Sequence, residues 1–369
     1  MVEFDTYLDQ MTVSGRLTAA EENGAVRCTA CAHRCLIRPG RRGICQVRFN
    51  RNGELRVPWG YVAGLQADPI EKKPFMHLLP GSEALTFGML GCNFHCPFCQ
   101  NWVTSQTLRD PSAGIDAGYI RQISPEKIVE AAKRSGADII ASSYNEPLIT
   151  TEWAVDIFQL AQAEGIRCVY VSNGYATPET LEYLRPFLTA LKIDLKCMHD
   201  RNYRLMGGVL KNVLETIRRA HEMGIWVEVV TLVVPGFNDS QEQLWDAARY
   251  LVSISADIPW HVTAFHPDYQ MNDRQSTSAA SLQQAAEIGQ EAGLHYVYAG
   301  NLPGRVGSLE DTHCPHCQER LIQRRGFTLL EYCITGQGTC PKCGTSIAGI
   351  WSDKPDTVRL GGWGLPRRI

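Results

Sequence analysis

Three cysteines that lie close together, Cys92, Cys96 and Cys99, have the spacing C-x3-C-x2-C. Cysteine thiolates are the usual ligands of iron–sulfur clusters, and a [4Fe–4S] cluster normally takes four of them. Three ligands leave one iron without a protein ligand, where a substrate or cofactor can bind directly. Structural zinc sites instead take four ligands, commonly as two separated C-x2-C pairs. The triplet therefore predicts a [4Fe–4S] cluster with one open iron.

A second cysteine group lies near the C-terminus as two C-x2-C pairs with twenty-two residues between them. This pattern is typical of a zinc ribbon, in which the metal supplies folding free energy on the order of 10 kcal/mol. Iron in a rubredoxin-like site is the alternative, and we favour zinc over it. The predicted ligands are Cys314, Cys317, Cys340 and Cys343.

A third cysteine group lies upstream with the spacing C-x2-C-x3-C-x9-C. Four ligands can hold zinc or a second iron–sulfur cluster, but this spacing matches neither paired zinc knuckles nor the common ferredoxin patterns. Both metals stay open at this point, with a slight preference for zinc. The predicted ligands are Cys28, Cys31, Cys35 and Cys45.

The overall composition is that of an ordinary globular protein. The 369 residues carry a formal net charge of −3, so no strong positive field suggests nucleic-acid binding. The sequence shows neither a signal-peptide pattern nor an apolar run long enough to span a membrane. Fourteen cysteines in such a chain indicate metal or redox chemistry before disulfides, and we expect a cytoplasmic protein.

Buried apolar runs alternate with helical patterns through the middle of the chain. Ser124 and Pro125, for example, form a capping signal that begins one of the helices. Six or more such units imply a parallel sheet with right-handed crossovers, either open or closed into a whole or partial barrel. The expected strands are Leu85–Met89, Ile139–Tyr144, Cys168–Ser172, Leu191–Leu195, Val227–Val233 and His261–Phe265, with Tyr296–Ala299 as a candidate seventh.

Polar residues follow these expected strands at their C-terminal ends, where α/β proteins gather their chemistry. Because the ends of parallel strands share one edge, we expect these side chains to lie around the cysteine triplet. They are Asn145, Glu146, Ser172, Asn173, Asp194, Lys196 and His266.

The run Gly91–Asn101, with the aromatic Phe98 directly before the last cysteine, resembles the signature of the radical S-adenosylmethionine (SAM) superfamily. It is similar to the activating-enzyme branch, typified by pyruvate formate-lyase activating enzyme. The order of motifs along nearly the whole chain resembles one subgroup, the AmmeMemoRadiSam-system radical SAM enzymes. The motifs besides the three cysteine groups are Tyr144-Asn145-Glu146-Pro147, Lys192-Ile193-Asp194-Leu195-Lys196 and Trp260-His261 followed by Phe265-His266-Pro267-Asp268-Tyr269.

The resemblance implies an α/β fold, a partial (β/α)6 TIM-like radical SAM barrel with small N-terminal and C-terminal cysteine-rich metal modules. We expect the N-terminal module at residues 1–80, the barrel at 81–304 and the zinc-ribbon-like module at 305–369. SAM would bind the open iron through its amine and carboxylate. One electron from the reduced cluster would then cleave a carbon–sulfur bond, and the resulting 5′-deoxyadenosyl radical would abstract hydrogen from a substrate.

The resemblance also implies roles for individual side chains. Phe98 would lie beside the adenine, Glu146 would accept a hydrogen bond from the cofactor amine, and Asp194 would lie near its carboxylate. Val171 and Val230 stand where pyruvate formate-lyase activating enzyme has an acidic residue and an arginine, which puts a bound monovalent cation in doubt. The other implied cofactor contacts are Asn145, Ser172, Asn173, Lys196 and His266.

The substrate is the least constrained part of this interpretation. One hypothesis is a partner protein that receives a glycyl radical, and the rival is a small molecule or a protein side chain. A zinc-ribbon scaffold without catalysis is a distant alternative, because a scaffold has no use for an open iron. The implied partners are an electron donor such as flavodoxin or ferredoxin, and a Memo-like or AMMECR1-like protein. Neither a membrane nor a nucleic acid is expected.

Overall fold

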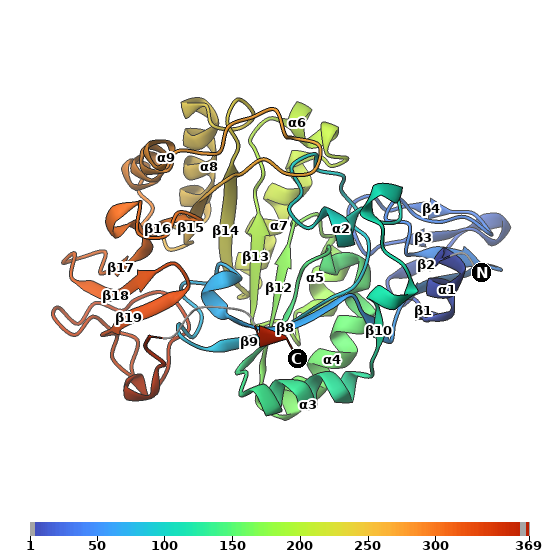
Figure 1. The fold of residues 1–369 in the computed structure, drawn as a ribbon, viewed down its shortest axis with the longest axis horizontal. Helices are drawn as coiled ribbons and strands as arrows, with labels where there is room; N and C mark the ends of the chain where they lie inside the picture. The colour runs from blue at the N-terminus through green and yellow to red at the C-terminus, as the bar shows by residue number, and fades with distance from the viewer. Residues whose placement is uncertain (1–3, 362–366, 369) are drawn as a thin grey trace.

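The computed structural model describes residues 4–361 and 367–368 (Figure 1). Within these residues, the largest sheet has nine strands in the order β16-β15-β14-β13-β12-β11-β9-β8-β20. The seven strands from β16 to β9 run parallel, while β8 and β20 add antiparallel at one edge. The strands are β8 (Gly64–Pro69), β9 (Glu83–Gly88), β11 (Ile139–Ser142), β12 (Arg167–Ser172), β13 (Ala190–Asp194), β14 (Trp226–Val233), β15 (Trp260–Ala264), β16 (Val297–Gly300) and β20 (Arg367–Arg368).

The predicted fold class is confirmed as an α/β fold with a central parallel sheet, consistent with a partial barrel. All six expected strands form, and so does the candidate seventh, each within two residues of its expected bounds. Their sequences are nearly continuous apolar runs because parallel strands are buried on both faces.

Helices connect the parallel strands and pack on one face of the sheet in a single large apolar cluster. The helix that Ser124 predicts begins as expected, since its hydroxyl accepts a hydrogen bond from the Lys127 N–H, and it ends at Gly136 in the left-handed conformation. The helices are α3 (Pro125–Ser135), α4 (Thr151–Ala163), α5 (Pro178–Leu184), α6 (Asp200–Leu205), α7 (Leu210–Glu222), α8 (Gln241–Ile254) and α9 (Ala279–Glu291).

A second, smaller apolar cluster fills the other face of the sheet near the N-terminal ends of the strands. Ala190 of β13 belongs to it, and because side chains alternate along a strand, Lys192 and Asp194 point to the same side further along. Phe75 and Leu78 reach this cluster from the segment between β8 and β9. This cluster, which we call the apolar floor, leaves the C-terminal ends of the strands free for polar residues. Its other buried members are Ile70, Ala84, Ile139, Ala141 and Val169.

Small sheets flank the central one on both sides (Figure 1). The hairpin of the C-terminal part packs on β16, because Tyr296 and Tyr298 share an apolar cluster with Leu321 and Leu329. The flanking elements are α1 (Phe4–Gln10), β1 (Thr12–Ser14), β2 (Thr18–Ala20), β3 (Val26–Cys28), β4 (Leu36–Ile37), β5 (Phe49–Arg51), β6 (Glu54–Pro58), β7 (Tyr61–Val62), α2 (Trp102–Ser105), β10 (Arg121–Gln122), β17 (Thr312–His313), β18 (Arg320–Arg325) and β19 (Thr328–Tyr332).

The expected boundaries of the three parts stay predictions. β8 belongs to the central sheet although it falls within 1–80, the range expected for the N-terminal module. Residues 1–3, 362–366 and 369, which the two outer modules were expected to include, lie outside the described residues. Across the described residues, no helix combines the length and apolar character that crossing a bilayer requires.

Candidate active site

The loop that carries the cysteine triplet follows β9 and is held by hydrogen bonds at several points. Gly91 has a φ of 91° and lies so close to Val47 that a Cβ would come within 2.9 Å of its side chain, so only glycine fits. Arg109 donates hydrogen bonds to the carbonyl oxygens of Cys92 at 2.7 Å and Phe94 at 2.8 Å. The backbone therefore fixes the positions of the cysteines independently of any bound group.

A cavity of about 410 Å³ opens at the C-terminal ends of the strands, and all three cysteines line it. Among the expected cofactor contacts, His266 is the exception: it is exposed, while its neighbour Phe265 is buried. Its expected place beside the adenosyl group stays a prediction that this cavity does not support. The expected contacts that line the cavity are Phe98, Asn145, Glu146, Ser172, Asn173, Asp194 and Lys196.

Glu146 is buried at one wall of this cavity and has a structural role as well. One carboxylate oxygen accepts hydrogen bonds from the Ser172 hydroxyl at 2.7 Å and the Leu148 N–H at 3.1 Å. The other accepts from the Asn173 N–H at 2.8 Å. Burial raises the pKa of Glu146 to about 7, despite these hydrogen bonds. The carboxylate thus ties two strand ends together and changes its charge near neutral pH.

Asp194, at the end of β13, lies between two lysines. It forms ion pairs with Lys192 and, at 3.2 Å, with Lys196. Burial would raise the pKa of Asp194, but the two lysines outweigh it and hold the pKa at about 2. The Asp194 charge also raises the pKa of Lys196, against the effect of burial. The trio therefore pairs one carboxylate with two lysines, which gives it a formal net positive charge.

The chain matches known proteins in the same region that forms this site. Residues 87–251 match the family model described as the radical SAM superfamily. An uncharacterized protein of Methanocaldococcus jannaschii is 38% identical over 308 residues, covering 83% of this chain and 90% of that protein. The chain belongs to the radical SAM superfamily. This radical SAM protein is therefore an enzyme, and its family implies a [4Fe–4S] cluster and SAM.

Two further similarities refine its placement within the superfamily. The pyruvate formate-lyase-activating enzyme of Staphylococcus aureus strain USA300 is 23% identical over 197 residues, covering 51% of this chain and 76% of that enzyme. A radical SAM methyltransferase structure from Sphaerobacter thermophilus is 17% identical with a TM-score of 0.46, covering 63% of this chain and 70% of that one. By sequence, the radical SAM protein is thus related to activating enzymes.

The donor set of the triplet fits a cluster better than a single metal ion. Cys92, Cys96 and Cys99 share one cavity. Within the described residues, the C-terminal cysteines form the one group in which three or more metal-ligating atoms lie within 4.8 Å of one another. The three sulfurs of the triplet are therefore wider apart than that. Three thiols that are wider apart suit ligands of three different irons. Ser105 adds a hydroxyl at 3.2 Å from the sulfur of Cys99, a contact of the kind that tunes cluster potentials.

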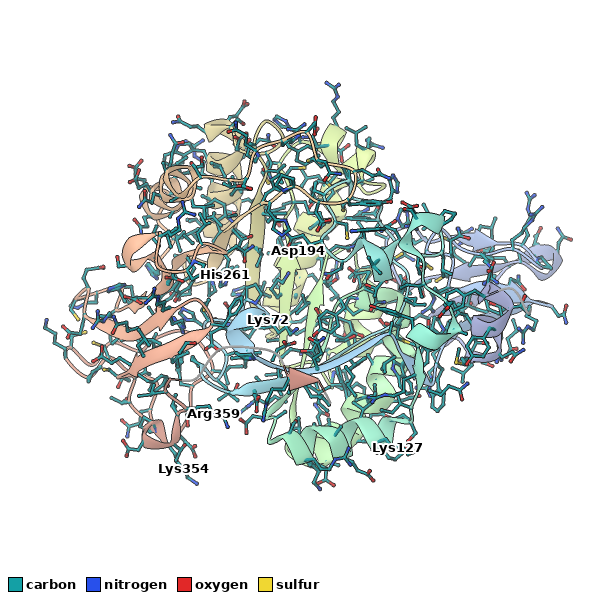
Figure 2. All side chains as sticks on the ribbon, viewed as in Figure 1. Lys72, Lys127, Asp194, His261, Lys354 and Arg359 are labelled. Atoms are coloured by element: carbon teal, nitrogen blue, oxygen red, sulfur yellow. The ribbon has the colours of Figure 1, made fainter. Side chains whose placement is uncertain are left out.

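Two further lysines that the sequence did not single out also line the cavity. Lys73 is almost fully buried and pairs with Asp68 at 2.6 Å, and Lys72 pairs with the same carboxylate at 2.8 Å. Burial lowers the pKa of Lys73 to about 8. Figure 2 labels Lys72 and Asp194, which lie over the middle of the sheet and line the same cavity. Because Lys72 and Lys73 share the single carboxylate of Asp68, this part of the cavity also has a formal net positive charge.

The C-terminal part of the radical SAM protein also reaches the cavity. Phe327, at the turn between β18 and β19, lines it together with Asn301 from the loop after β16. The buried Glu310 holds both segments, accepting hydrogen bonds from the N–H groups of Gly304 at 2.8 Å and Gly326 at 2.7 Å. No local sequence signal predicts this contact, because it depends on how the hairpin packs on the barrel.

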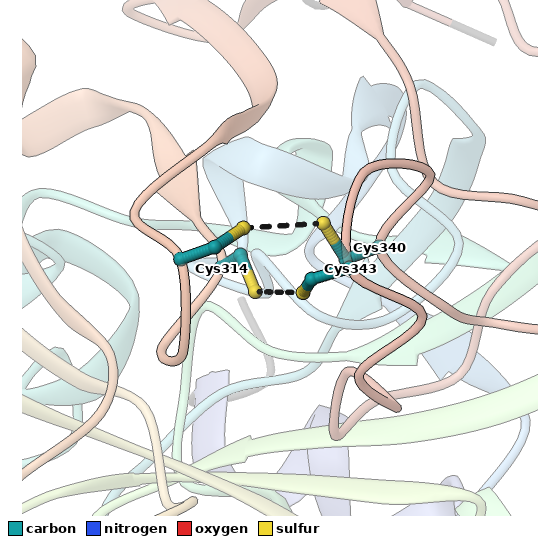
Figure 3. A group of neighbouring side chains, drawn as sticks. Cys314, Cys340 and Cys343 are labelled. Atoms are coloured by element: carbon teal, nitrogen blue, oxygen red, sulfur yellow. Dashed lines mark hydrogen bonds between the residues drawn. The ribbon is translucent and has the colours of Figure 1, made fainter.

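The four C-terminal cysteines converge on one point (Figure 3). The sulfurs of Cys314 and Cys343 are 3.6 Å apart, and those of Cys317 and Cys340 are 3.7 Å apart. Four thiols at such distances suit tetrahedral coordination of one ion. The group can therefore hold a metal, and zinc stays the predicted one.

Proposed function

We propose that this enzyme reductively cleaves SAM and uses the 5′-deoxyadenosyl radical to take hydrogen from a partner protein, leaving a glycyl radical there. The observation that carries the proposal is the single cavity shared by the cysteine triplet, Glu146 and the Asp194–Lys196 pair. When bound, the [4Fe–4S] cluster supplies the electron and an iron with no protein ligand. Similarity to pyruvate formate-lyase-activating enzyme supports the choice of a protein substrate.

The side chains around the cavity would then bind and orient SAM. The ionised form of Glu146 has one oxygen with a single hydrogen-bond donor, so it can accept another from the SAM amine. Lys196, beside the cysteines, offers a positive charge to the carboxylate of SAM. Phe98, packed against Phe237 with ring centroids 5.5 Å apart, offers an aromatic surface for the adenine. These side chains also cover the reacting atoms from water.

The partners follow from the same proposal. A one-electron donor such as flavodoxin or ferredoxin must reduce the cluster before each cleavage. The motif order of the AmmeMemoRadiSam subgroup supports a Memo-like or AMMECR1-like protein as a partner. The predicted cytoplasmic location agrees with fourteen free cysteines, since reducing compartments keep thiols unpaired.

A second candidate substrate is a small anionic molecule, and two further lysines that line the cavity favour it. Lys72 and Lys73 share one carboxylate, so a carboxylate or phosphate group of a substrate would find an uncompensated positive charge there. Phe327 would cover an apolar part of the same molecule.

The deciding experiment follows the hydrogen atom. The anaerobically reconstituted enzyme is mixed with SAM, a reductant and a candidate partner protein whose glycines carry deuterium. The proposal predicts deuterium in the 5′-deoxyadenosine and a glycyl-radical doublet in the electron paramagnetic resonance spectrum of the partner. Deuterium transfer from a labelled small anion would instead establish the second candidate. That transfer should be lost in Lys72→Ala and kept in Lys127→Ala, a control at an exposed lysine.

A further inference from the structure

The four N-terminal cysteines lie beside the active-site loop, and all but the half-buried Cys35 are buried. Cys28 ends β3, and Cys31, Cys35 and Cys45 lie in the turns that follow. The Cys28 N–H donates a hydrogen bond to the Cys35 carbonyl at 2.9 Å, which holds these two ligand positions side by side. The Cys31 thiol is close enough to those of Cys28 and Cys45 to interact with both. The four thiols are therefore neighbours in the fold.

The spacing of these sulfurs differs from that of the C-terminal group. Tetrahedral zinc holds its sulfurs at about 2.3 Å from one centre, which gathers them closely. The C-terminal cysteines meet this condition, with all four sulfurs within 4.8 Å of one another. Among the described residues, neither the N-terminal group nor the triplet places three ligand atoms that close. The N-terminal group thus resembles the triplet, whose family implies a cluster, and not the compact site.

A buried cation lies next to the N-terminal thiols. Arg48 is 1% exposed and donates hydrogen bonds to both carboxylate oxygens of Glu152, at 2.7 and 2.8 Å. Its guanidinium is also close enough to the Cys28 and Cys45 thiols to interact with both. Its Nε has no hydrogen-bond partner in the part of the chain that the structure describes. An unpartnered donor beside thiolates suits a bound anionic cluster, whose sulfurs accept hydrogen bonds.

Two side chains, Asn93 and Arg109, connect this cysteine group to the active-site loop. Asn93 follows Cys92 directly, and its fully buried side chain faces the sulfur of Cys31. Within the described residues its Nδ2 has no hydrogen-bond partner, while its Oδ1 accepts one from Asn173 at 2.7 Å. Arg109 forms the second contact, because it donates to the carbonyls of both Cys92 and Ile44. The two cysteine groups therefore share one rigid wall.

We propose that Cys28, Cys31, Cys35 and Cys45 hold an iron–sulfur cluster, and that this cluster passes an electron to the cluster at the triplet. Reduced flavodoxin or ferredoxin would transfer one electron to the N-terminal cluster. That electron would then pass to the cluster at the triplet, where SAM cleavage consumes it. The relay cluster is thus unchanged after each turnover. Leu36 and Ile44, both exposed, flank Cys35 and Cys45, so an electron donor can approach this side closely. The relay rests on the proposed SAM cleavage, whereas the metal assignment does not.

The metal assignment is tested by removing the other cluster. In the triple variant Cys92→Ala, Cys96→Ala, Cys99→Ala the N-terminal group is intact, so its folding is not at risk. After anaerobic reconstitution this variant should keep at least about two iron atoms per chain with matching sulfide. It should also keep about one zinc, at the C-terminal group. About two zinc atoms and no iron would overturn the assignment.

The relay is tested by the ratio of two rates of 5′-deoxyadenosine formation, one driven by reduced flavodoxin and one by dithionite. Cys31→Ser in the full-length enzyme should lower this ratio at least tenfold, because the small reductant can reach the triplet cluster directly. Asn50→Ala, in the same module but not at the cysteines, should leave the ratio unchanged. An unaltered ratio in Cys31→Ser would overturn the relay. If the wild type forms no 5′-deoxyadenosine at all, the proposed function fails, while the iron measurement still decides the metal.

Discussion

The Ser172 hydroxyl donates a hydrogen bond of 2.7 Å to the carboxylate of Glu146, which links the end of β12 to the turn after β11. Both side chains line the cavity that holds the cysteine triplet. The strand ends and the wall proposed to bind SAM therefore share the same hydrogen bonds. A substitution at this point should change cofactor binding and local structure together.

SAM affinity should rise with pH in the wild type. Burial raises the pKa of Glu146 to about 7, so the carboxyl is largely protonated at pH 6 and largely ionised at pH 8. Protonation turns one oxygen into a donor, so the ionised form is the stronger acceptor for the SAM amine. Glu146→Gln should weaken SAM binding at pH 8 by roughly tenfold to a hundredfold, the value of a hydrogen bond to a charged group. Calorimetry at pH 6, 7 and 8 measures this.

The matched control for that experiment is Glu287→Gln, at an exposed glutamate of α9 that is not among the residues lining the cavity. It should bind SAM as the wild type does. If Glu146→Gln kept the same increase in affinity between pH 6 and pH 8, the increase would have another source, such as the amine of SAM itself. The role of Glu146 would then be structural.

Asp194→Asn should destabilise the fold as well as abolish SAM binding, because it leaves Lys192 and Lys196 without their counter-ion. We expect the free energy of unfolding to fall by about 2 kcal/mol. This is less than the cost of breaking a fully buried ion pair, because Asp194 is partly exposed. The folded-state pKa is about 2, so this stabilisation is present above pH 4 and disappears as the pH falls toward 2. Urea titration at pH 7 and pH 3 checks both statements.

An exposed ion pair provides the comparison for Asp194. Glu130 lies 3.9 Å from Arg134 on the surface, so Glu130→Gln should cost less than about 1 kcal/mol. Equal losses in the two variants would mean that the Asp194 trio contributes nothing beyond an ordinary surface contact.

Removing one C-terminal cysteine should release the metal. Cys314→Ala should lose about one zinc per chain and destabilise the hairpin that carries Phe327, since structural zinc supplies much of the folding free energy of such modules. Cys333 lies between the two pairs in sequence but is outside the group of four that converges. Cys333→Ala should therefore retain the zinc, and its loss in this variant would place Cys333 among the ligands.

Acid should destabilise the contact between the C-terminal part and the sheet through His77. Burial lowers the pKa of His77 to about 4, and its ring nitrogens contact the Ala348 carbonyl and the Tyr298 hydroxyl, each at 2.6 Å. The neutral ring is favoured in the folded state, so stability is complete above about pH 6.5 and falls as the pH drops toward 4. The loss should reach about 3 kcal/mol.

Denaturation midpoints at pH 7, 6 and 5 measure that loss. His77→Gln should be less stable than the wild type at pH 7, yet its stability should fall less steeply with acid. An identical slope in the two proteins would show that other groups cause the acid sensitivity.

The features that sequence reasoning predicted are those set by local patterns. β12 and β13 are continuous apolar runs, and the helix between Ser124 and Gly136 has clear signals at both ends. Asp194 was predicted from its place after a strand. The strand alternation could also have placed Lys192 on the same face, two residues earlier, because side chains of one strand repeat every second residue.

The features that sequence reasoning missed depend on contacts between distant parts of the chain. β20 pairs with β8 through Arg367 and Ala67, which are far apart in the sequence. No local pattern marks a strand of only two residues. Lys73 enters the cavity because the segment after β8 folds across the apolar floor. Phe327 does so because Glu310 anchors its hairpin. Only the assembled fold brings these residues to the site.

Production of 5′-deoxyadenosine from SAM tests the account most directly. The reconstituted wild type, reduced under anaerobic conditions, should form 5′-deoxyadenosine and methionine in equal amounts. Cys96→Ala should form none, while Cys168→Ala, which removes a fully buried thiol on the other side of the sheet, should keep the wild-type rate. Wild-type formation no faster than that of Cys96→Ala would contradict the assignment of this cavity as the site of SAM cleavage.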